Sequence, residues 1–184
     1  MPVTADDIAD LRRDSPDYAE TEQLKAEIEQ LRQTRDPFHL TAAELDKIFR
    51  WKLVQQYERG RARRDSNTNE ACRVVTEAAF RVHVDDIDLE AEIRLGILTS
   101  LRGVGVPVAS AILALTDPAD YCVIDFRGWR AVFNEDKHSF SVPEYRRYRN
   151  QVAELADELS WPVQEVDLAI WCYDRRKPKN CSSV

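Results

Sequence analysis

The sequence predicts an all-α protein, a compact bundle of about seven or eight helices. Strand signals are nearly absent, because no segment keeps up an alternation of apolar and polar residues. Helix-start signals recur along the chain, and apolar side chains follow them at spacings of three and four. A length of 184 residues with 43% hydrophobic content suits one domain over residues 1–184, with room for two small helical lobes.

The N-terminal half contains four predicted helical segments. Residues 1–35 read as a charged helical extension, interrupted at Ser15 and Pro16. Thr41 and Glu44 have the spacing of a capping box and open the second segment. Asn67 is the predicted N-cap of the third. The fourth begins near residue 88, and its predicted buried face carries Leu89, Ile93, Ile97, Leu98 and Leu101.

The C-terminal half shows three further helix starts. Asp125 is placed to cap a short helix over residues 126–133. Ser141 and Glu144 form a second capping box, and the first helical turn tolerates the proline at position 143. A last helix follows Pro162, and residues 177–184 are predicted to be a flexible tail.

Composition and charge narrow the class of protein. The N-terminus is polar and acidic, and no apolar run reaches the length of a membrane span, so we expect a cytoplasmic protein with no membrane partner. The net charge of −7 argues against a broad nucleic-acid-binding face. Basic clusters at residues 58–64, 145–149 and 174–179 read individually as solvated surface. The cysteines lack metal-ligand spacing, so we expect no metal and free thiols at Cys72, Cys122, Cys172 and Cys181.

One apolar segment, LRGVGVPVASAIL at residues 101–113, is broken by two glycines and a proline. Gly103 and Gly105 allow a tight turn, and Pro107 fits the first turn of a new helix. The segment therefore predicts two helices joined by a hairpin of about four residues. A plain helical hairpin with a glycine turn remains one interpretation.

The predicted hairpin also has the features of a phosphate-binding site. Glycines let a phosphate approach the backbone, and amides at the start of the second helix favour an anion. Such a device binds a nucleic-acid backbone without reading bases. The predicted backbone-contacting residues are Arg102, Gly103, Val104, Gly105 and Val106.

Twenty residues after Gly105 stands YCVIDFRGWRAVF, in which apolar residues precede Asp125. The hairpin, this spacing, the aspartate and the basic helix after it together resemble the helix-hairpin-helix DNA glycosylase superfamily, over residues 95–133. The resemblance implies that Asp125 stabilises a cationic sugar while a base is removed. It implies that Arg127 contacts DNA. It also implies a monovalent cation, K⁺ or Na⁺, held by backbone carbonyls within residues 102–107.

The chain departs from that superfamily in the hairpin. Some members carry there a lysine that forms a Schiff base and cleaves the strand, and Pro107 occupies that position here. The resemblance therefore implies a monofunctional enzyme with no hairpin lyase activity. Lys52 is predicted to be a surface residue unless the fold brings it to the pocket. An extruded base needs aromatic walls, and the candidates are Trp51, Trp129 and Trp171.

Three functions stay open at this point. The protein can be a monofunctional DNA glycosylase that acts on a damaged or modified base. It can be a non-catalytic helix-hairpin-helix module that binds DNA, or a protein-interaction domain that retains the fold.

Overall fold

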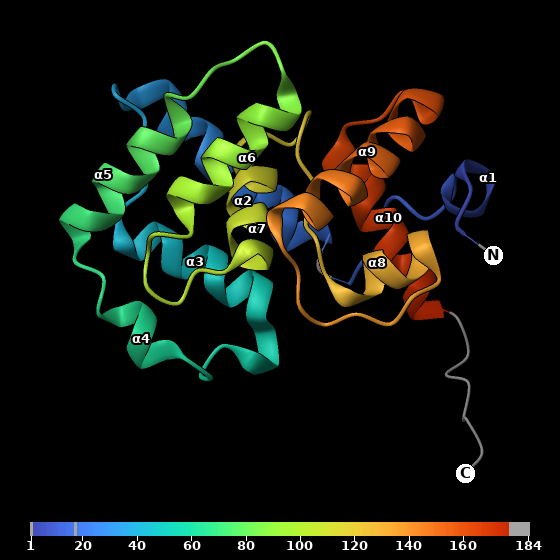
Figure 1. Ribbon diagram of the computed structural model, residues 1–184, viewed down its shortest axis with the longest axis horizontal. Coiled ribbons are helices and arrows are strands. Elements are labelled where there is room, and N and C mark those ends of the chain that lie inside the picture. The colour runs from blue at the N-terminus through green and yellow to red at the C-terminus, as the bar shows by residue number, and fades with distance from the viewer. Residues whose placement is uncertain (1, 17, 177–184) are drawn as a thin grey trace.

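The computed structural model describes residues 2–16 and 18–176, and in these ranges it contains helices and no strands (Figure 1). The all-α prediction is confirmed. The described chain has ten α-helices and one 3₁₀ turn, so the predicted count of seven or eight is too low. Two helices, α1 (Ala5–Ile8) and α4 (Arg61–Asp65), are about one turn long. They are too short to show a helical period in the sequence.

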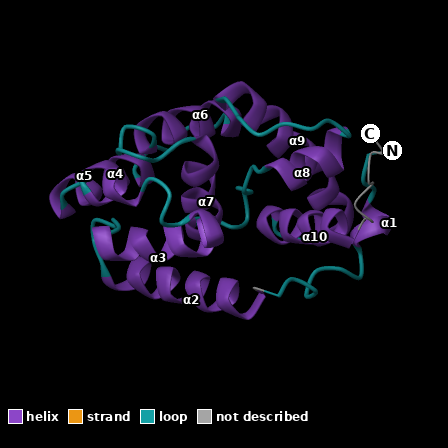
Figure 2. Cartoon of the chain, turned by 90° about the horizontal axis from the view of Figure 1, so that it is seen from below, coloured by secondary structure: helices purple, strands orange, loops and turns teal. Residues whose placement is uncertain are grey.

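The longer helices form two groups, and the buried helix α7 belongs to the first of them. They are α2 (Tyr18–Thr34), α3 (Ala42–Leu53), α5 (Asn69–Phe80), α6 (Ile87–Leu98), α7 (Val106–Thr116), α8 (Phe126–Phe133), α9 (Val142–Leu159) and α10 (Val163–Arg176). The 3₁₀ turn η1 (Val54–Gln56) directly follows α3. Figures 1 and 2 show α2 to α7 on one side and α8 to α10, with α1, on the other.

The N-terminal segment belongs to the packed body. Helix α1 packs against α9 and α10, and α2 packs against α7. Ile8, Leu24 and Ile28 are all buried in the core. Residues 5–34, predicted as a charged extension, therefore contribute apolar side chains to the same core as the rest of the chain.

Several predicted caps are present. Thr41 with Glu44, and Ser141 with Glu144, form complete capping boxes, and Asp125 caps α8. The predicted cap at Asn67 is wrong, because the neighbouring Thr68 side chain accepts the hydrogen bond from the Ala71 amide and α5 begins one residue later. Asn67 instead contacts the hairpin between α6 and α7.

The predicted buried face of α6 is also wrong in part. Leu89 and Ile93 are exposed, at 46% and 36%. Glu90 and Arg94 point inward instead, paired at 2.9 Å, and the Tyr121 hydroxyl donates to Glu90. The face of α6 that points into the core is therefore the one that carries Glu90 and Arg94, and not the face that the apolar spacing predicted.

The described cysteines, Cys72, Cys122 and Cys172, are buried, and no disulfide joins them to one another. Cys181 and the predicted tail at residues 177–184 lie outside the described residues. None of the described helices has the length and apolarity required to cross a bilayer. Nor do the described residues bring three potential His, Cys, Asp or Glu ligands together as a metal site would.

Candidate functional site

The hairpin joins α6 to α7 through residues 99–105, and its two glycines have different conformations. Gly103 has a φ of +79°, and a Cβ built there would lie 2.7 Å from Cγ of Arg64. Gly105 is the extended N-cap of α7, with a φ of −99°. A Cβ at Gly105 would meet nothing closer than Pro107 Cδ at 3.9 Å. The fold therefore requires a glycine at position 103 and does not require one at position 105.

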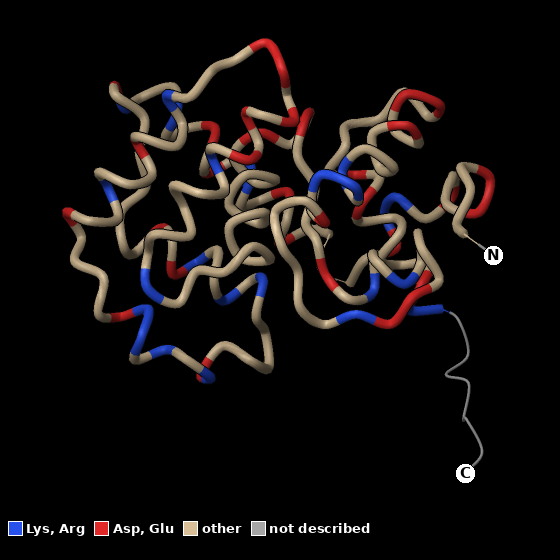
Figure 3. The backbone as a smooth tube through the Cα atoms, in the orientation of Figure 1, with Lys and Arg blue, Asp and Glu red and all other residues tan. Residues whose placement is uncertain are grey.

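The basic segment around α4 is attached to this hairpin. The Asn67 side chain accepts from the Arg102 amide and donates to the Arg102 carbonyl, both at 2.9 Å. The Arg64 side chain is buried beneath Gly103 and donates to the carbonyl of Tyr57. The exposed arginines of this region, here called the basic rim, are Arg59, Arg61, Arg63 and Arg102. Figure 3 shows blue stretches of Lys and Arg along the part of the chain that Figure 1 labels α4.

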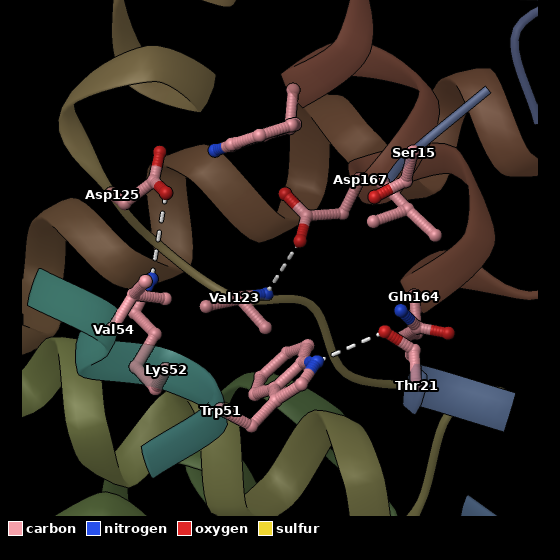
Figure 4. A pocket seen from close by; sticks show the side chains of 11 residues that line it. Ser15, Thr21, Trp51, Lys52, Val54, Val123, Asp125, Gln164 and Asp167 are labelled. Atoms are coloured by element: carbon pink, nitrogen blue, oxygen red, sulfur yellow. Dashed lines mark hydrogen bonds and ion pairs between the residues drawn. The ribbon is translucent and has the colours of Figure 1, made fainter. Parts of the chain in front are cut away.

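One carboxylate oxygen of Asp125 caps α8, and the other points toward Lys52. Its Oδ1 accepts from the backbone amides of Arg127 and Gly128, each at 2.9 Å. Its Oδ2 lies 3.4 Å from Nζ of Lys52, which comes from the end of α3 (Figure 4). The Asp125 side chain keeps 21% of its surface exposed, so the carboxylate is not sealed inside its own helix start.

Asp125 and Lys52 line a pocket with a volume of about 600 Å³, its open mouth included. The pocket lies between the two groups of helices. Its walls come from the segment before α2, from α2, α3, η1, the strand-like approach to α8, and α10. The lining residues are Ser15, Thr21, Trp51, Lys52, Val54, Val123, Asp125, Gln164, Asp167, Leu168 and Trp171 (Figure 4).

A second carboxyl group, Asp167 of α10, lines the pocket from a buried position. It accepts from the Val123 amide at 3.0 Å and from the Tyr148 hydroxyl at 2.5 Å. Burial raises the pKa of Asp167 to about 7, and the negative charge of Asp125 acts in the same direction. A Cβ at Gly128 would lie 2.2 Å from the Tyr148 oxygen, so glycine at 128 lets Tyr148 reach Asp167.

The fold brings some of the predicted residues together and separates others. Trp51 and Trp171 line the pocket, and the Trp51 indole donates to Thr21 at 2.9 Å. Trp129 does not line the pocket, because it is 2% exposed and its ring packs against Phe133 and Phe140.

The basic residue at the start of α8, Arg127, lies next to Trp171, which lines the pocket. Arg127 pairs with Asp174 at 3.3 Å, and its guanidinium lies 5.4 Å from the centre of the Trp171 ring. The predicted surface position of Lys52 is wrong, because its side chain is only 12% exposed and points at Asp125. The end of α3 abuts the start of α8, which the sequence pattern does not reveal.

The mouth of the pocket also carries a strained apolar residue that sequence patterns did not single out. Val54 has a φ of +41°, and it is 64% exposed. A β-branched residue rarely adopts a positive φ, and such a conformation costs about 1–3 kcal/mol. Backbone strain of this kind gathers at functional sites, and here it falls at the mouth of the pocket.

Gln164 and Asp167 were likewise not predicted. Both interrupt the apolar positions of α10, where Val163, Val166 and Ala169 are buried. Polar residues placed three apart on an otherwise apolar helix face are the signal that points to them.

Compared with protein-family models, with curated proteins and with solved structures, the chain gives no match. The interpretation of this site therefore depends on its own geometry and chemistry.

Proposed function

We propose that this protein is a DNA base-excision enzyme that hydrolyses the N-glycosidic bond of a damaged or modified base, without a lyase step. The observation that carries the proposal is the position of Asp125. Its carboxylate lines an accessible pocket that Trp51 and Trp171 also line, twenty residues after Gly105 of the hairpin. A carboxylate that served only as a helix cap would not need that pocket.

The chemistry follows from the two oxygens of Asp125. Breaking the bond between base and deoxyribose develops positive charge on the sugar, and a nearby carboxylate stabilises that charge. The Arg127 and Gly128 amides hold Oδ1 and fix the direction of the group. Oδ2 then faces the pocket, where it can stabilise the sugar cation or orient a water molecule.

The proposed substrate nucleotide leaves the base stack before it reacts. An extruded base needs apolar and aromatic walls, which Trp51, Trp171 and Leu168 supply here. Val54 is an exposed apolar side chain at the mouth of the pocket. Apolar side chains of this kind insert between base steps when a protein distorts a duplex.

The proposed DNA contacts combine the hairpin and the basic rim. The face above Gly105 is open, so a phosphate can approach the backbone amides of Gly105 and Val106. The next residue, Pro107, has no amide N–H to offer, and the Val108 amide already donates to the Gly105 carbonyl. Arg59, Arg63 and Arg102 extend this surface with exposed positive charge. The acidic body of the protein therefore need not oppose DNA, because several exposed arginines lie next to the hairpin.

A monovalent cation at the hairpin remains part of the proposal. The Arg102 carbonyl accepts from Asn67, and the Gly105 carbonyl accepts from amides of α7. The carbonyls of Gly103 and Val104 accept no hydrogen bond from the described residues. These two oxygens fit a weakly held K⁺ or Na⁺, whose role would be to hold the turn rather than to react.

The role proposed for Lys52 is electrostatic. Its ammonium group, 3.4 Å from Asp125, holds the carboxylate in place between reactions. The alternative is that Lys52 attacks the sugar and replaces the lysine that the hairpin lacks. Borohydride reduction in the presence of cleavable DNA separates the two, since we expect no trapped protein–DNA adduct. A trapped adduct that disappears in Lys52→Arg would show a lyase.

The decisive experiment measures excision from a panel of duplexes, each with one modified base, by the wild type and by Asp125→Asn. Asparagine can still cap α8 but carries no charge, so we expect excision to fall by about 10²-fold or more while DNA binding persists. The matched control is Asp86→Asn, since Asp86 caps α6 through the Asp88 and Leu89 amides away from the pocket. Excision that survives Asp125→Asn would rule out the proposed catalytic role.

The two alternatives predict different outcomes in the same assays. A non-catalytic DNA-binding module would bind duplexes, lose affinity steeply as salt rises, and excise no base. A protein-interaction domain would bind neither duplex nor single-stranded DNA at low salt.

A further inference from the structure

Two polar side chains of α10 face the pocket next to each other in the helix. Gln164 and Asp167 are three positions apart, so they lie on the same side of α10. Both line the pocket, and they are only 1% and 7% exposed. Neither is needed to cap a helix or to neutralise a partner on the surface.

The Gln164 amide is held in one orientation. Its Oε1 accepts from Nζ of Lys25 at 3.0 Å, and because an ammonium group can only donate, the oxygen must face Lys25. The Nε2 group is left on the pocket side, as Figure 4 shows. It has no hydrogen-bond partner among the described residues. Because this donor lines the pocket and has no protein partner, it is open to a ligand that enters the pocket.

The Asp167 carboxyl is held equally firmly and presents acceptors. One oxygen receives the Val123 amide and the other receives the Tyr148 hydroxyl. Each carboxylate oxygen can accept more than one hydrogen bond. The group therefore keeps acceptor capacity that is directed into the pocket. A fixed donor thus stands beside a fixed acceptor.

We propose that Gln164 and Asp167 read the hydrogen-bonding edge of the bound base. The pocket then accepts bases with a carbonyl next to a ring N–H, which are uracil, thymine, hypoxanthine and guanine and their modified forms. The Gln164 amide donates to the carbonyl, and Asp167 accepts from the ring N–H. This inference rests on the proposed function, since it names the substrate class for the same pocket.

The same pair rejects cytosine and adenine. Both bases place an amino group next to an unprotonated ring nitrogen, so a donor would face the Gln164 amide and an acceptor would face Asp167. Buried polar groups left unpaired in this way give strong discrimination. The indole N–H of Trp51 is already bonded to Thr21, so Trp51 contributes its ring and no competing donor.

The experiment compares pairs of bases that have the same ring system but exchange hydrogen-bond donors and acceptors along one edge. In two pairs of duplexes, one position carries a 2′-fluoroarabino nucleotide, which resists hydrolysis. The base at that position is uracil or cytosine in the first pair, and hypoxanthine or adenine in the second. A further duplex carries a tetrahydrofuran abasic analogue. Affinities are measured at pH 8, above the raised pKa of about 7 of Asp167. We expect uracil to bind about tenfold or more tightly than cytosine, and hypoxanthine likewise over adenine.

The substitution Gln164→Glu tests directly whether Gln164 recognises the base. It keeps an oxygen for Lys25 and replaces the pocket donor by an acceptor, so both affinity ratios should fall toward one. Affinity for the abasic analogue, which offers no base edge, is measured alongside so that any general effect of the added charge on DNA binding can be divided out. The matched control is Gln33→Glu, which adds the same charge at an exposed position near the far end of α2 and should keep both ratios.

The outcomes separate this inference from the proposed function. Equal affinity for all bases on a protein that binds DNA, or tighter binding of cytosine and adenine, would overturn the inference alone. If no duplex binds, the proposed function fails. The inference is then tested with free uracil and free cytosine, followed by the NMR signal of the Trp51 indole N–H and assigned with Trp51→Phe. Uracil must shift that signal and cytosine must not, or the inference fails as well.

Discussion

The hairpin and the pocket both lie where one helix gives way to another, but they are built from different parts of the chain. The hairpin is seven consecutive residues, and its exposed surface combines backbone with the side chains of Ser100 and Arg102. The pocket draws side chains from α2, α3, η1, α10 and the approach to α8. A site made of consecutive residues can be recognised in a sequence. A site made of converging side chains depends on the packing that brings them together, and is therefore more sensitive to changes in the core.

The largest test of this difference is Gly128→Ala, which should damage the pocket through the core. A Cβ at position 128 would overlap the Tyr148 hydroxyl, and Tyr148 is fully buried. We expect a loss of roughly 3 kcal/mol in the free energy of unfolding, measured by urea denaturation.

The control for that substitution is Gly96→Ala in α6. A Cβ there meets nothing within 4 Å, so alanine should raise stability by about 0.5–1 kcal/mol. If Gly128→Ala were as harmless as Gly96→Ala, Tyr148 would not be fixed against Asp167, and the pocket would be less dependent on the core than we infer.

A second test uses pH to detect the buried carboxyl of the pocket. The pKa of Asp167 is raised to about 7 in the folded state by burial, while an unfolded aspartate titrates near 4. The folded state therefore binds the proton more tightly, and this contribution to stability is present below pH 4 and lost as pH rises through 7. We expect a decrease of roughly 2 kcal/mol in the stability of the wild type relative to Asp167→Asn between pH 5 and pH 8.

The comparison with Asp167→Asn isolates this one group. Asp117 also has a raised pKa, but it is present in both proteins and cancels in the difference. Glu44 and Glu144 have pKa values lowered to about 2, so they titrate below the chosen window. Parallel stability curves for the two proteins over this window would contradict the buried, proton-binding state of Asp167.

The sequence predicted the parts of the molecule that depend on neighbours along the chain. The glycines and proline of residues 101–113 predicted the break between α6 and α7, and Asp125 was recognised as the cap of α8. Each of these features is fixed by backbone conformation within a few residues, where residue type has a direct physical consequence.

The side chains of the pocket could not be predicted in the same way. Lys52 was expected on the surface because its own helix gives no sign that α8 begins beside it. Leu89 and Ile93 were expected in the core because the inward pairing of Glu90 with Arg94 is a tertiary contact. In each case a partner distant in sequence determined which face was buried, and no local pattern encodes that partner.

A third test addresses the hairpin through Gly103. Alanine there must adopt a positive φ and must also displace the buried Arg64 side chain. We expect a loss of about 2 kcal/mol, measured by urea denaturation, with the left-handed conformation as the main cause. A loss much below 1 kcal/mol would show that Arg64 and the turn relax together, and the hairpin would be less rigid than its contacts with Asn67 suggest.

The smallest effect on stability, and the sharpest on function, is expected at Gly105. Its backbone is extended and its surroundings are open, so alanine removes chain entropy from the unfolded state but makes a poorer N-cap, and stability should change by less than about 0.5 kcal/mol. A methyl group at that position nevertheless lies where a phosphate would approach α7, so DNA affinity should fall while stability stays nearly constant. Fluorescence anisotropy with a duplex, beside urea denaturation, measures both. Unchanged affinity in Gly105→Ala would mean that the fold has no use for this glycine and that DNA does not contact it, leaving the basic rim alone to bind the backbone.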